Sequence, residues 1–393
     1  MMEMIYIAKD IPLWQVTIWD KKFNNVDKKW QPKTIKYKYL LSDELDSLRV
    51  DDGDVRILYT GKDVGFTTEE LAGDRLSEGE IISIPWGGIP TVKYHKGKFV
   101  TGDNRIATSK DINKLTNKYL YYFMRGNIHE IASYYRGASL KHPCMKDILK
   151  MTISYPSVQE QDKICGQFDV LEQIIEVRKQ ELQLLDDLIK ARFVEMFGDP
   201  RSNPYGFNMK MLKDTCKVIT GNTPSRSVEE YYGDYVEWIK TDNIVSGLLN
   251  PTKASEMLSE EGMKVGRAVG KDSILMACIA GSIASIGRVC VTDRTVAFNQ
   301  QINAVVPEDY NILFLYVLLQ LSKEYLAEEV NMALKGILSK SKLEEKEFMV
   351  PPIELQNQFA DFVHQVDKSK VAVQKALDET QLLFESLMQK YFD

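Results

Sequence analysis

The chain has 393 residues, of which 44% are hydrophobic and 27% charged, and its formal net charge is −6. This composition is typical of a soluble globular protein with two or three domains. No apolar run approaches the roughly 20 residues that a membrane span needs, and the N-terminal segment has no signal-peptide pattern. The five cysteines form no Cys-x-x-Cys pair and the four histidines are scattered, so we expect free thiols, a cytoplasmic location and no metal site.

The first segment, about residues 1–155, predicts a strand-rich α+β module. Strand-like runs cover residues 55–59, 80–84 and 98–100, with glycine-rich turns between them. Helices are predicted at about 115–125 and 129–135. The module is slightly basic, with 24 Lys and Arg against 20 Asp and Glu.

A long helix is predicted from Val158 to Phe197, and the sequence Gly198-Asp199-Pro200 is a typical helix stop. This segment is acidic, with 10 acidic against 5 basic residues in 156–200. Its apolar residues follow a heptad pattern. They are Ile164, Phe168, Leu171, Ile175, Leu182, Leu185, Ile189 and Met196.

The second module, about residues 201–350, repeats the order of the first. Val236–Thr241 resembles Val55–Thr60, and Asn299–Ile302 resembles Asp103–Ile106. The offset between matching residues is 181 near the start and 195–196 later, so the loops differ in length while the frame is kept. The alternative is that two unrelated α+β domains align by chance.

A second heptad helix follows Pro351, in the same register as the first at an offset of 195 residues. Its apolar residues are Phe359, Val363, Val366, Val373, Leu377, Phe384, Leu387 and Tyr391. We expect the two helices to pair within the chain, antiparallel or parallel, although a homotypic coiled-coil dimer is an alternative. Polar side chains that interrupt the two seams would fix the register. They are Arg178, Arg192, Lys370 and Thr380.

No enzymatic constellation is present in the sequence. Gly266–Asp272 is one residue short of a phosphate-binding loop and lacks the Ser or Thr that would bind magnesium. Ser202–Tyr205 has its aromatic residue one place too early for the loop that grips a flipped base. We therefore nominate no catalytic residue and expect a non-catalytic protein, with an unrecognised active site as the alternative.

Several ordered segments resemble the specificity subunit of type I restriction–modification systems. They are Thr220–Arg226, Tyr235–Ile244, Gly281–Val289, Phe298–Ala304 and Pro351–Gln356, followed by the closing helix. The duplicated order covers essentially the whole chain. The first module departs from the pattern, with Asp10–Trp14 in place of the Gly-x-Thr-Pro-Ser segment, a lysine-rich insertion, and Ile57 where the second has Trp238.

The resemblance implies an α+β fold with two target-recognition domains, residues 1–155 and 201–350. Each is followed by a spacer helix, 156–200 and 351–393, and the two helices pair as an intramolecular antiparallel coiled coil. Each domain would read one half of a bipartite, asymmetric site in double-stranded DNA, and the helices would set the gap. Two methyltransferase subunits and restriction/motor subunits would be the partners. S-adenosylmethionine, ATP and Mg would bind to those partners and not to this chain.

Candidate DNA-contacting residues follow from the pairing rules for base edges and phosphates. In the second module they are Ser225, Arg226, Lys240, Thr241, Asn243, Ser282 and Arg288; in the first they are Tyr59, Lys62, Lys93, Lys33 and Lys36. Trp238 and Phe298 are expected to pack in the core, and Asn299–Gln301 to satisfy backbone near a strand end.

For partner docking we expect the helix faces outside the seam, where an acidic surface would suit a basic methyltransferase. The residues are Gln161, Gln356, Glu172, Glu176 and Asp186. Two alternatives remain at this stage: a coiled-coil scaffold that binds protein rather than DNA, and a silent copy of the specificity module without DNA-reading activity.

Overall fold

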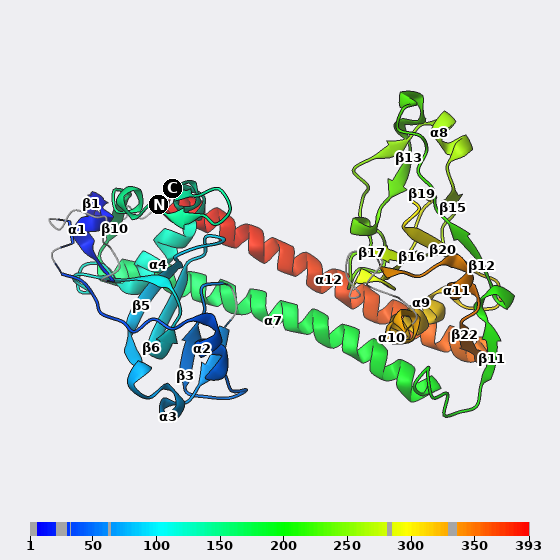
Figure 1. Cartoon of the computed structure of the whole chain (residues 1–393), viewed down its shortest axis with the longest axis horizontal. Coiled ribbons are helices and arrows are strands. Elements are labelled where there is room, and N and C mark those ends of the chain that lie inside the picture. Colours follow the sequence, from blue (N-terminus) through cyan, green and yellow to red (C-terminus); the bar gives the residue numbers. More distant parts are fainter. Residues whose placement is uncertain are drawn as a thin grey trace. The chain divides into compact units, whose positions relative to one another are not determined.

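A computed structural model describes residues 6–20, 30–31, 33–61, 64–280, 285–328 and 336–392 (Figure 1). The chain divides into two compact units. Unit 1 comprises Met1–Val177 and Leu377–Asp393, and unit 2 comprises Arg178–Ala376. Each unit therefore combines one α+β module with part of both long helices.

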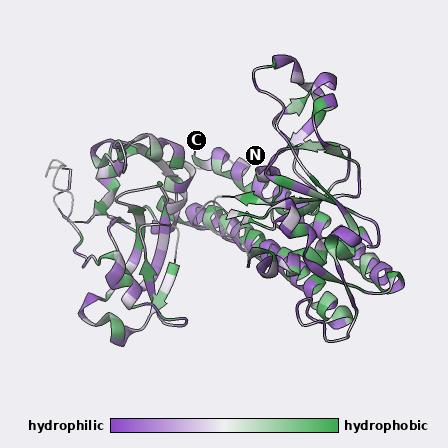
Figure 2. Cartoon of the chain, turned by 45° about the vertical axis from the view of Figure 1, so that its right-hand side comes forward, coloured by the Kyte–Doolittle hydropathy of each residue, from purple (hydrophilic) through white to green (hydrophobic). Residues whose placement is uncertain are grey.

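The two long helices are α7 (Val158–Phe197) and α12 (Ile353–Phe392), each of 40 residues. At 1.5 Å per residue each is about 60 Å long. The bounds of α7 are those predicted, and its end has the expected cause. Gly198 adopts a φ of +77°, and its N–H donates to the carbonyl oxygen of Val194 at 2.8 Å. In Figure 2 both helices alternate hydrophilic and hydrophobic residues along their length, as two-faced helices should.

Within each unit, α7 and α12 run antiparallel. In unit 1 the ring of Phe168, near the start of α7, lies 5.2 Å from the ring of Phe384, near the end of α12. In unit 2 the ring of Phe193, near the end of α7, lies 5.5 Å from that of Phe359, near the start of α12. The pair is therefore intramolecular and antiparallel.

Most predicted seam residues pack against the hydrophobic cores. Those that are buried are Ile164, Phe168, Leu171, Phe359, Val363, Val366, Val373, Leu377 and Phe384. Those that are partly buried are Ile175, Leu182, Leu185, Ile189 and Leu387. The heptad pattern missed buried residues near the ends of the helices, because the modules pack against a second face of each helix there. These are Cys165, Phe193, Phe197, Ala360, Met388 and Phe392.

Unit 1 is built on a six-stranded sheet with the order β2-β7-β5-β6-β3-β4. Its strands are β2 Thr17–Trp19, β3 Val55–Leu58, β4 Val64–Thr67, β5 Ser77–Pro85, β6 Lys93–Thr101 and β7 Asn104–Ser109. Two small pairs are β1 Tyr6–Pro12 with β10 Thr152–Pro156, and β8 Tyr135–Arg136 with β9 His142–Pro143. The helices are α1 Leu13–Val16, α2 Ser42–Ser47, α3 Glu69–Ala72, α4 Asn117–Gly126, α5 Ile128–Ser133 and α6 Met145–Ile148. The three predicted strands correspond to β3, β5 and β6, and the two predicted helices to α4 and α5.

Unit 2 contains two four-stranded sheets with the orders β12-β20-β16-β18 and β14-β13-β19-β15. The first consists of β12 Cys216–Thr220, β20 Ile302–Pro307, β16 Ile274–Ala277 and β18 Val289–Val291. The second consists of β14 Met257–Leu258, β13 Tyr232–Ile239, β19 Val296–Phe298 and β15 Ala268–Val269. Small pairs are β11 Asn208–Met211 with β22 Glu347–Val350, and β17 Ile279–Ala280 with β21 Gly336–Ile337. The helices are α8 Glu260–Val265, α9 Ile312–Leu321, α10 Lys323–Ala327 and α11 Lys340–Glu344.

The predicted duplication is present in the hydrogen-bond frame. In unit 1 the parallel pair β3/β6 places Ile57 opposite Val100, and in unit 2 the parallel pair β13/β19 places Trp238 opposite Ala297. The amide of Leu13 donates to the carbonyl oxygen of Met151 at 2.8 Å, and that of Leu212 to Lys346 at 2.9 Å. The two modules therefore share one frame although few of their residues are identical.

A buried glutamine bonds each module to the helix that follows it. The expectation that Gln161 and Gln356 lie on a docking face is therefore wrong. Gln161 accepts from the amide of Thr116 at 2.8 Å and donates to the carbonyl oxygens of Lys114 and Pro156. Gln356, 195 residues later, accepts from the amide of Asn311 at 2.9 Å and donates to the carbonyl oxygen of Pro351. Both side chains are completely buried, so neither can meet a partner.

The acidic residues assigned to docking also have partners within the chain, as Glu172 and Asp186 show. Glu172 accepts from the hydroxyl of Tyr122 at 2.9 Å and pairs with Arg125. Asp186 forms an ion pair with Lys370, which lies at a seam position of α12; the Nζ and Oδ1 atoms are 2.6 Å apart. Glu176 is exposed. The acidic row therefore serves internal packing first, because recognition-module helices and the partner helix reach it.

Candidate nucleic-acid interface

The loop from Gly221 to Ser227 in unit 2 is fixed against the end of β19. Its Gly221 amide donates to the carbonyl oxygen of Ile302 at 3.0 Å, and the Asn222 amide donates to that of Phe298 at 3.1 Å. A Cβ atom at Gly221 would lie 2.1 Å from the carbonyl oxygen of Asn299. Only glycine therefore allows the loop to lie so close to this carbonyl oxygen. Near its end the loop carries an accessible arginine.

That arginine, Arg226, and Lys240 at the end of β13 meet at one carboxylate. The Arg226 Nη2 atom lies 2.6 Å from Glu256 Oε2, and the Lys240 Nζ atom lies 2.6 Å from Glu256 Oε1. The Arg226 guanidinium also lies over the rings of Tyr232 and Trp238, with its Cζ atom 4.5 and 5.1 Å from the ring centres. We call Arg226, Lys240 and Glu256, with these two rings, the β13 cluster.

The β13 cluster combines accessible charge with restrained geometry. The side chains of Arg226, Lys240 and Glu256 are 55%, 28% and 36% exposed. Hydrogen bonds from Lys240 and then Arg226 hold the pKa of the Glu256 carboxyl below its usual range. With the carboxylate ionised, the cluster has one net positive charge, and its cations can reach an anion in solution.

Among the other candidates in unit 2, Asn243, Thr241 and Arg288 are buried or half-buried, whereas Ser225 is exposed. Asn243 is 8% exposed; it accepts from the Lys240 amide at 2.9 Å and donates to the carbonyl oxygen of Lys253 at 3.1 Å. Asn243 is therefore a structural residue of the turn rather than a reader of bases. Thr241 is half-buried in the same turn, and its carbonyl oxygen accepts from Arg288 Nη2 at 3.2 Å. The hydroxyl of Ser225 is exposed and lies 2.8 Å from that of Ser227. Ser282 lies outside the described residues.

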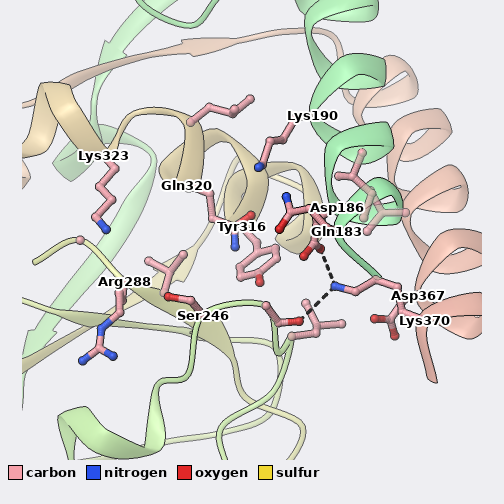
Figure 3. Close-up of a pocket in the computed structure, with 17 residues that line it drawn as sticks. Gln183, Asp186, Lys190, Ser246, Arg288, Tyr316, Gln320, Lys323, Asp367 and Lys370 are labelled. Atoms are coloured by element: carbon pink, nitrogen blue, oxygen red, sulfur yellow. Dashed lines mark hydrogen bonds and ion pairs between the residues drawn. The ribbon is translucent and has the colours of Figure 1, made fainter. Parts of the chain in front are cut away.

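Arg288 also donates to the carbonyl oxygen of Ser285 at 3.3 Å, so its guanidinium braces two loops. It lines a cavity of about 400 Å³ within unit 2 (Figure 3). Lys370 bounds this cavity on the helix side, where it bonds both Asp186 and the carbonyl oxygen of Gly247, at 2.6 and 3.0 Å. The cavity lining has an excess of basic residues, with Lys190, Arg288, Lys323 and Lys370 against Asp186 and Asp367.

The candidates of unit 1 behave differently. Lys93 is folded inward: its Nζ atom donates to the carbonyl oxygens of Tyr59, at 2.5 Å, and of Gly61. The hydroxyl of Tyr59 donates to Asp46 Oδ1 at 2.9 Å. Lys33 and Lys36 are exposed, while Lys62 lies outside the described residues. Lys93 therefore stabilises the turn after β3, because that turn leaves carbonyl oxygens without sheet partners.

Arg105 is a charged residue that the sequence did not single out. It is 1% exposed, and its Nη1 atom lies 3.1 Å from Asp20 Oδ1 while Nη2 pairs with Asp103. Its Cζ atom lies 4.6 Å from the centre of the Trp86 ring. Buried charges need such ion pairs, so Arg105 organises the core of unit 1, although its buried Nε atom has no hydrogen-bond partner among the described residues.

Expected packing residues lie where they were placed. Trp238 and Phe298 are 3% and 0% exposed. Asn299 is buried, and its side chain accepts from the Gln301 amide at 3.1 Å, so it satisfies the turn before β20. Gln300 is exposed and accepts from the hydroxyl of Thr223.

The described residues contain no group of three or more His, Cys, Asp or Glu side chains that could hold a metal ion. Four cysteines are buried and free, and burial raises the pKa of their thiols to about 12. They are Cys165, Cys216, Cys278 and Cys290. Thiols held protonated in this way are poor nucleophiles. Across the same part of the chain, no helix is both long and apolar enough to cross a membrane.

The chain matches the family model of the type I restriction modification DNA specificity domain twice, over residues 46–186 and 204–380. It is 35% identical over 120 residues to the type I restriction enzyme HindI specificity subunit of Haemophilus influenzae; this covers 30% of the chain but only 25% of that protein. It is 24% identical over 308 residues to the MjaIX specificity subunit of Methanocaldococcus jannaschii, covering 70% of the chain and 68% of that protein.

Two solved structures share the fold. The S subunit of a type I restriction–modification system from M. genitalium has a TM-score of 0.62 at 14% identity, covering 100% of this chain and 97% of that one. A chain from a structure of type I R-M complex assembly and conformational transition has a TM-score of 0.52 at 16% identity, with 98% and 97% covered. The agreement extends over both modules and both helices.

Proposed function

Because the chain belongs to the type I restriction modification DNA specificity family, we propose that it is the sequence-reading subunit of a type I restriction–modification complex. Unit 1 and unit 2 each read one half of a bipartite, asymmetric DNA site. The observation that carries this proposal is the duplicated frame: two modules repeat the same strand pairing and the same glutamine anchor, yet differ in the loops at the end of the parallel strands.

The charge distribution supports a reader that works inside a complex. The net charge of the chain is −6, whereas affinity for DNA grows with the number of phosphates that Lys and Arg neutralise. The β13 cluster supplies accessible cations locally, but a chain with this balance needs basic partners to hold DNA tightly. Two methyltransferase subunits fill that role, together with restriction/motor subunits, and these partners bind S-adenosylmethionine, ATP and Mg.

The long helices set the gap between the half-sites in this proposal. A heptad is about 10 Å of helix, which equals about 3 base pairs of DNA. Removing one heptad from both α7 and α12, at positions that face one another, should shorten the recognised gap by about 3 base pairs and leave both half-sites unchanged. An unaltered gap would refute the role of the helices as a spacer.

The decisive experiment is long-read mapping of modified bases in a host without its own DNA methylation. The host expresses this chain together with the methyltransferase subunit encoded beside it. One bipartite motif, modified only when this chain is present, supports the proposal and identifies both half-sites. Modification that is independent of this chain, in a complex shown to assemble, overturns it in favour of a scaffold or a silent copy.

A further inference from the structure

If Arg226 and Lys240 of the β13 cluster contact DNA, the acidic residue between them, Glu256, still needs an explanation. Glu256 is contributed by the residue just before β14, 30 residues from Arg226 and 16 from Lys240. It bonds each cation through a different oxygen, both at 2.6 Å. A single anion with two oxygen atoms therefore occupies the point on which both cations converge.

The cations are also oriented before any ligand arrives. The Arg226 guanidinium lies over the rings of Tyr232 and Trp238, and the Lys240 Nζ atom lies 5.3 Å from the centre of the Trp238 ring. Trp238 is itself anchored, because its Nε1 donates to the carbonyl oxygen of Asn222 at 3.3 Å. Cations over aromatic faces keep their charge while they lose freedom of movement.

We infer that Arg226 and Lys240 form a clamp for one DNA backbone phosphate, and that Glu256 is the built-in anion that a phosphate displaces. This rests on the proposed function of the chain as a DNA reader. In the free protein Glu256 is a positioning residue, which keeps the two cations together and lowers their attraction for DNA of any sequence.

A phosphate fits this cluster better than a guanine edge does. Reading guanine takes two parallel N–H donors of one arginine in the plane of the base, whereas here an arginine and a lysine share one anion from two directions. A phosphate offers two non-bridging oxygen atoms to cations of either kind. The geometry of the two Glu256 oxygens therefore matches the ligand oxygens of a phosphate.

The test measures binding of the assembled complex to two DNA duplexes, one with the mapped site and one without it, over a range of salt concentrations. Loss of one phosphate contact makes the fall of log K with log salt less steep by about 0.9. Relative to 1 M salt, this corresponds to a loss of affinity of about 8-fold at 0.1 M salt. Arg226→Met and Lys240→Met should each show this loss equally on both duplexes, with the modified motif unchanged. Glu256→Gln should raise affinity for the duplex without the site by up to about 8-fold.

Matched controls are Glu261→Gln and Lys264→Met, which alter an exposed ion pair on α8 in the same unit; both should leave the slope unchanged. Melting temperatures confirm that each variant is folded, and Arg226→Lys serves if the Met variant is not.

Relaxed specificity at one base of the half-site would overturn the clamp in favour of base reading. An unchanged or lower affinity of Glu256→Gln would overturn the role of that acid. If the wild-type complex shows no motif that depends on this chain, the proposed function itself fails; if the motif is present and the slopes do not move, only the clamp fails.

Discussion

Unit 1 and unit 2 agree in their frame and differ where their parallel strands end. In both, a buried glutamine fixes the module to a long helix. At the end of β13, Lys240 extends to Glu256 and remains partly exposed. The matching position in unit 1 is Tyr59, whose hydroxyl bonds Asp46, while Lys93 turns inward onto backbone carbonyl oxygens. The frame thus places each module, and the strand ends are free to differ.

Burial explains why the ends of the parallel strands differ between the modules while the hydrogen bonds of the frame are kept. The frame bonds are made by the fully buried side chains of Gln161 and Gln356, and an unpaired buried donor or acceptor costs about 1–3 kcal/mol. The strand-end ion pairs are exposed, and such pairs contribute about 0–1 kcal/mol each. Residues at the strand ends can therefore be exchanged with little loss of stability. This is what a protein needs if its modules read different sequences on one scaffold.

The largest test of the shared frame is to remove the aromatic residue at the end of each long helix. Phe197 packs on Phe314 in unit 2 and Phe392 packs on Tyr119 in unit 1, with ring centres 4.8 and 5.2 Å apart. We expect Phe197→Ala to cost about 4 kcal/mol and Phe392→Ala about 3 kcal/mol, since Phe392 is slightly more exposed.

Hydrogen exchange followed by mass spectrometry measures this unit by unit. Phe197→Ala should raise exchange in unit 2 and Phe392→Ala in unit 1. The control is Val194→Ala on the exposed face of α7, which should change little. Equal loss of protection throughout the chain after either Phe substitution would show that the two units are one folding unit and that the comparison between them is not valid.

A smaller effect is expected from the glutamine anchors. Gln161→Met and Gln356→Met keep the side-chain volume but leave the amides of Thr116 and Asn311 without an acceptor. Each substitution should cost about 2–3 kcal/mol, measured by thermal unfolding, with Gln173→Met on the exposed side of α7 as the control. A loss in only one of the two variants would mean that the anchor is used in one unit and is incidental in the other.

Elements with a strong local signal were predictable from the sequence. The heptad spacing, with Gly198 after it, defines α7 to the residue. The glutamine anchors also had a signal, because Gln161 and Gln356 occupy the same place after a proline at an offset of 195 residues. A polar residue on a helix is usually exposed, however, so the sequence alone favours a docking role for both glutamines.

The missed residues depend on distant partners. Glu256 precedes a two-residue strand with no pattern of its own, and only the fold brings it to Arg226 and Lys240. Arg105 is buried because Asp20, 85 residues earlier, neutralises it. Phe193 lies off the heptad seam, and it is buried by α9 rather than by α12 alone. For these side chains no local pattern in the sequence indicates which distant residue they contact.

The smallest expected effect concerns one position that matches between the two modules. Only the residue of unit 2 at this position should make stability depend on pH. In unit 2 this position is Glu237, which accepts from Arg294 Nη2 and Nε at 2.7 and 3.1 Å and from the Ala254 amide at 2.9 Å. In unit 1 it is Arg56, whose Cζ atom lies 4.9 Å from the centre of the Phe66 ring. The hydrogen bonds from Arg294 hold the pKa of the Glu237 carboxyl below its ordinary value of 4.5.

A carboxyl whose pKa is lowered by folding stabilises the protein above its unfolded pKa, and this contribution is lost as the pH falls through the folded pKa. Glu237→Gln should therefore cost about 1–2 kcal/mol at pH 7, and its difference from the wild type should shrink below about pH 4. Arg56→Met should show a difference that stays constant over that range, because a guanidinium over a ring does not change its charge there. Denaturant unfolding at a series of pH values, followed in each unit by hydrogen exchange, measures both differences. A Glu237→Gln difference that is independent of pH would mean that the ion pair contributes through packing, and the two matched positions would then be equivalent in kind.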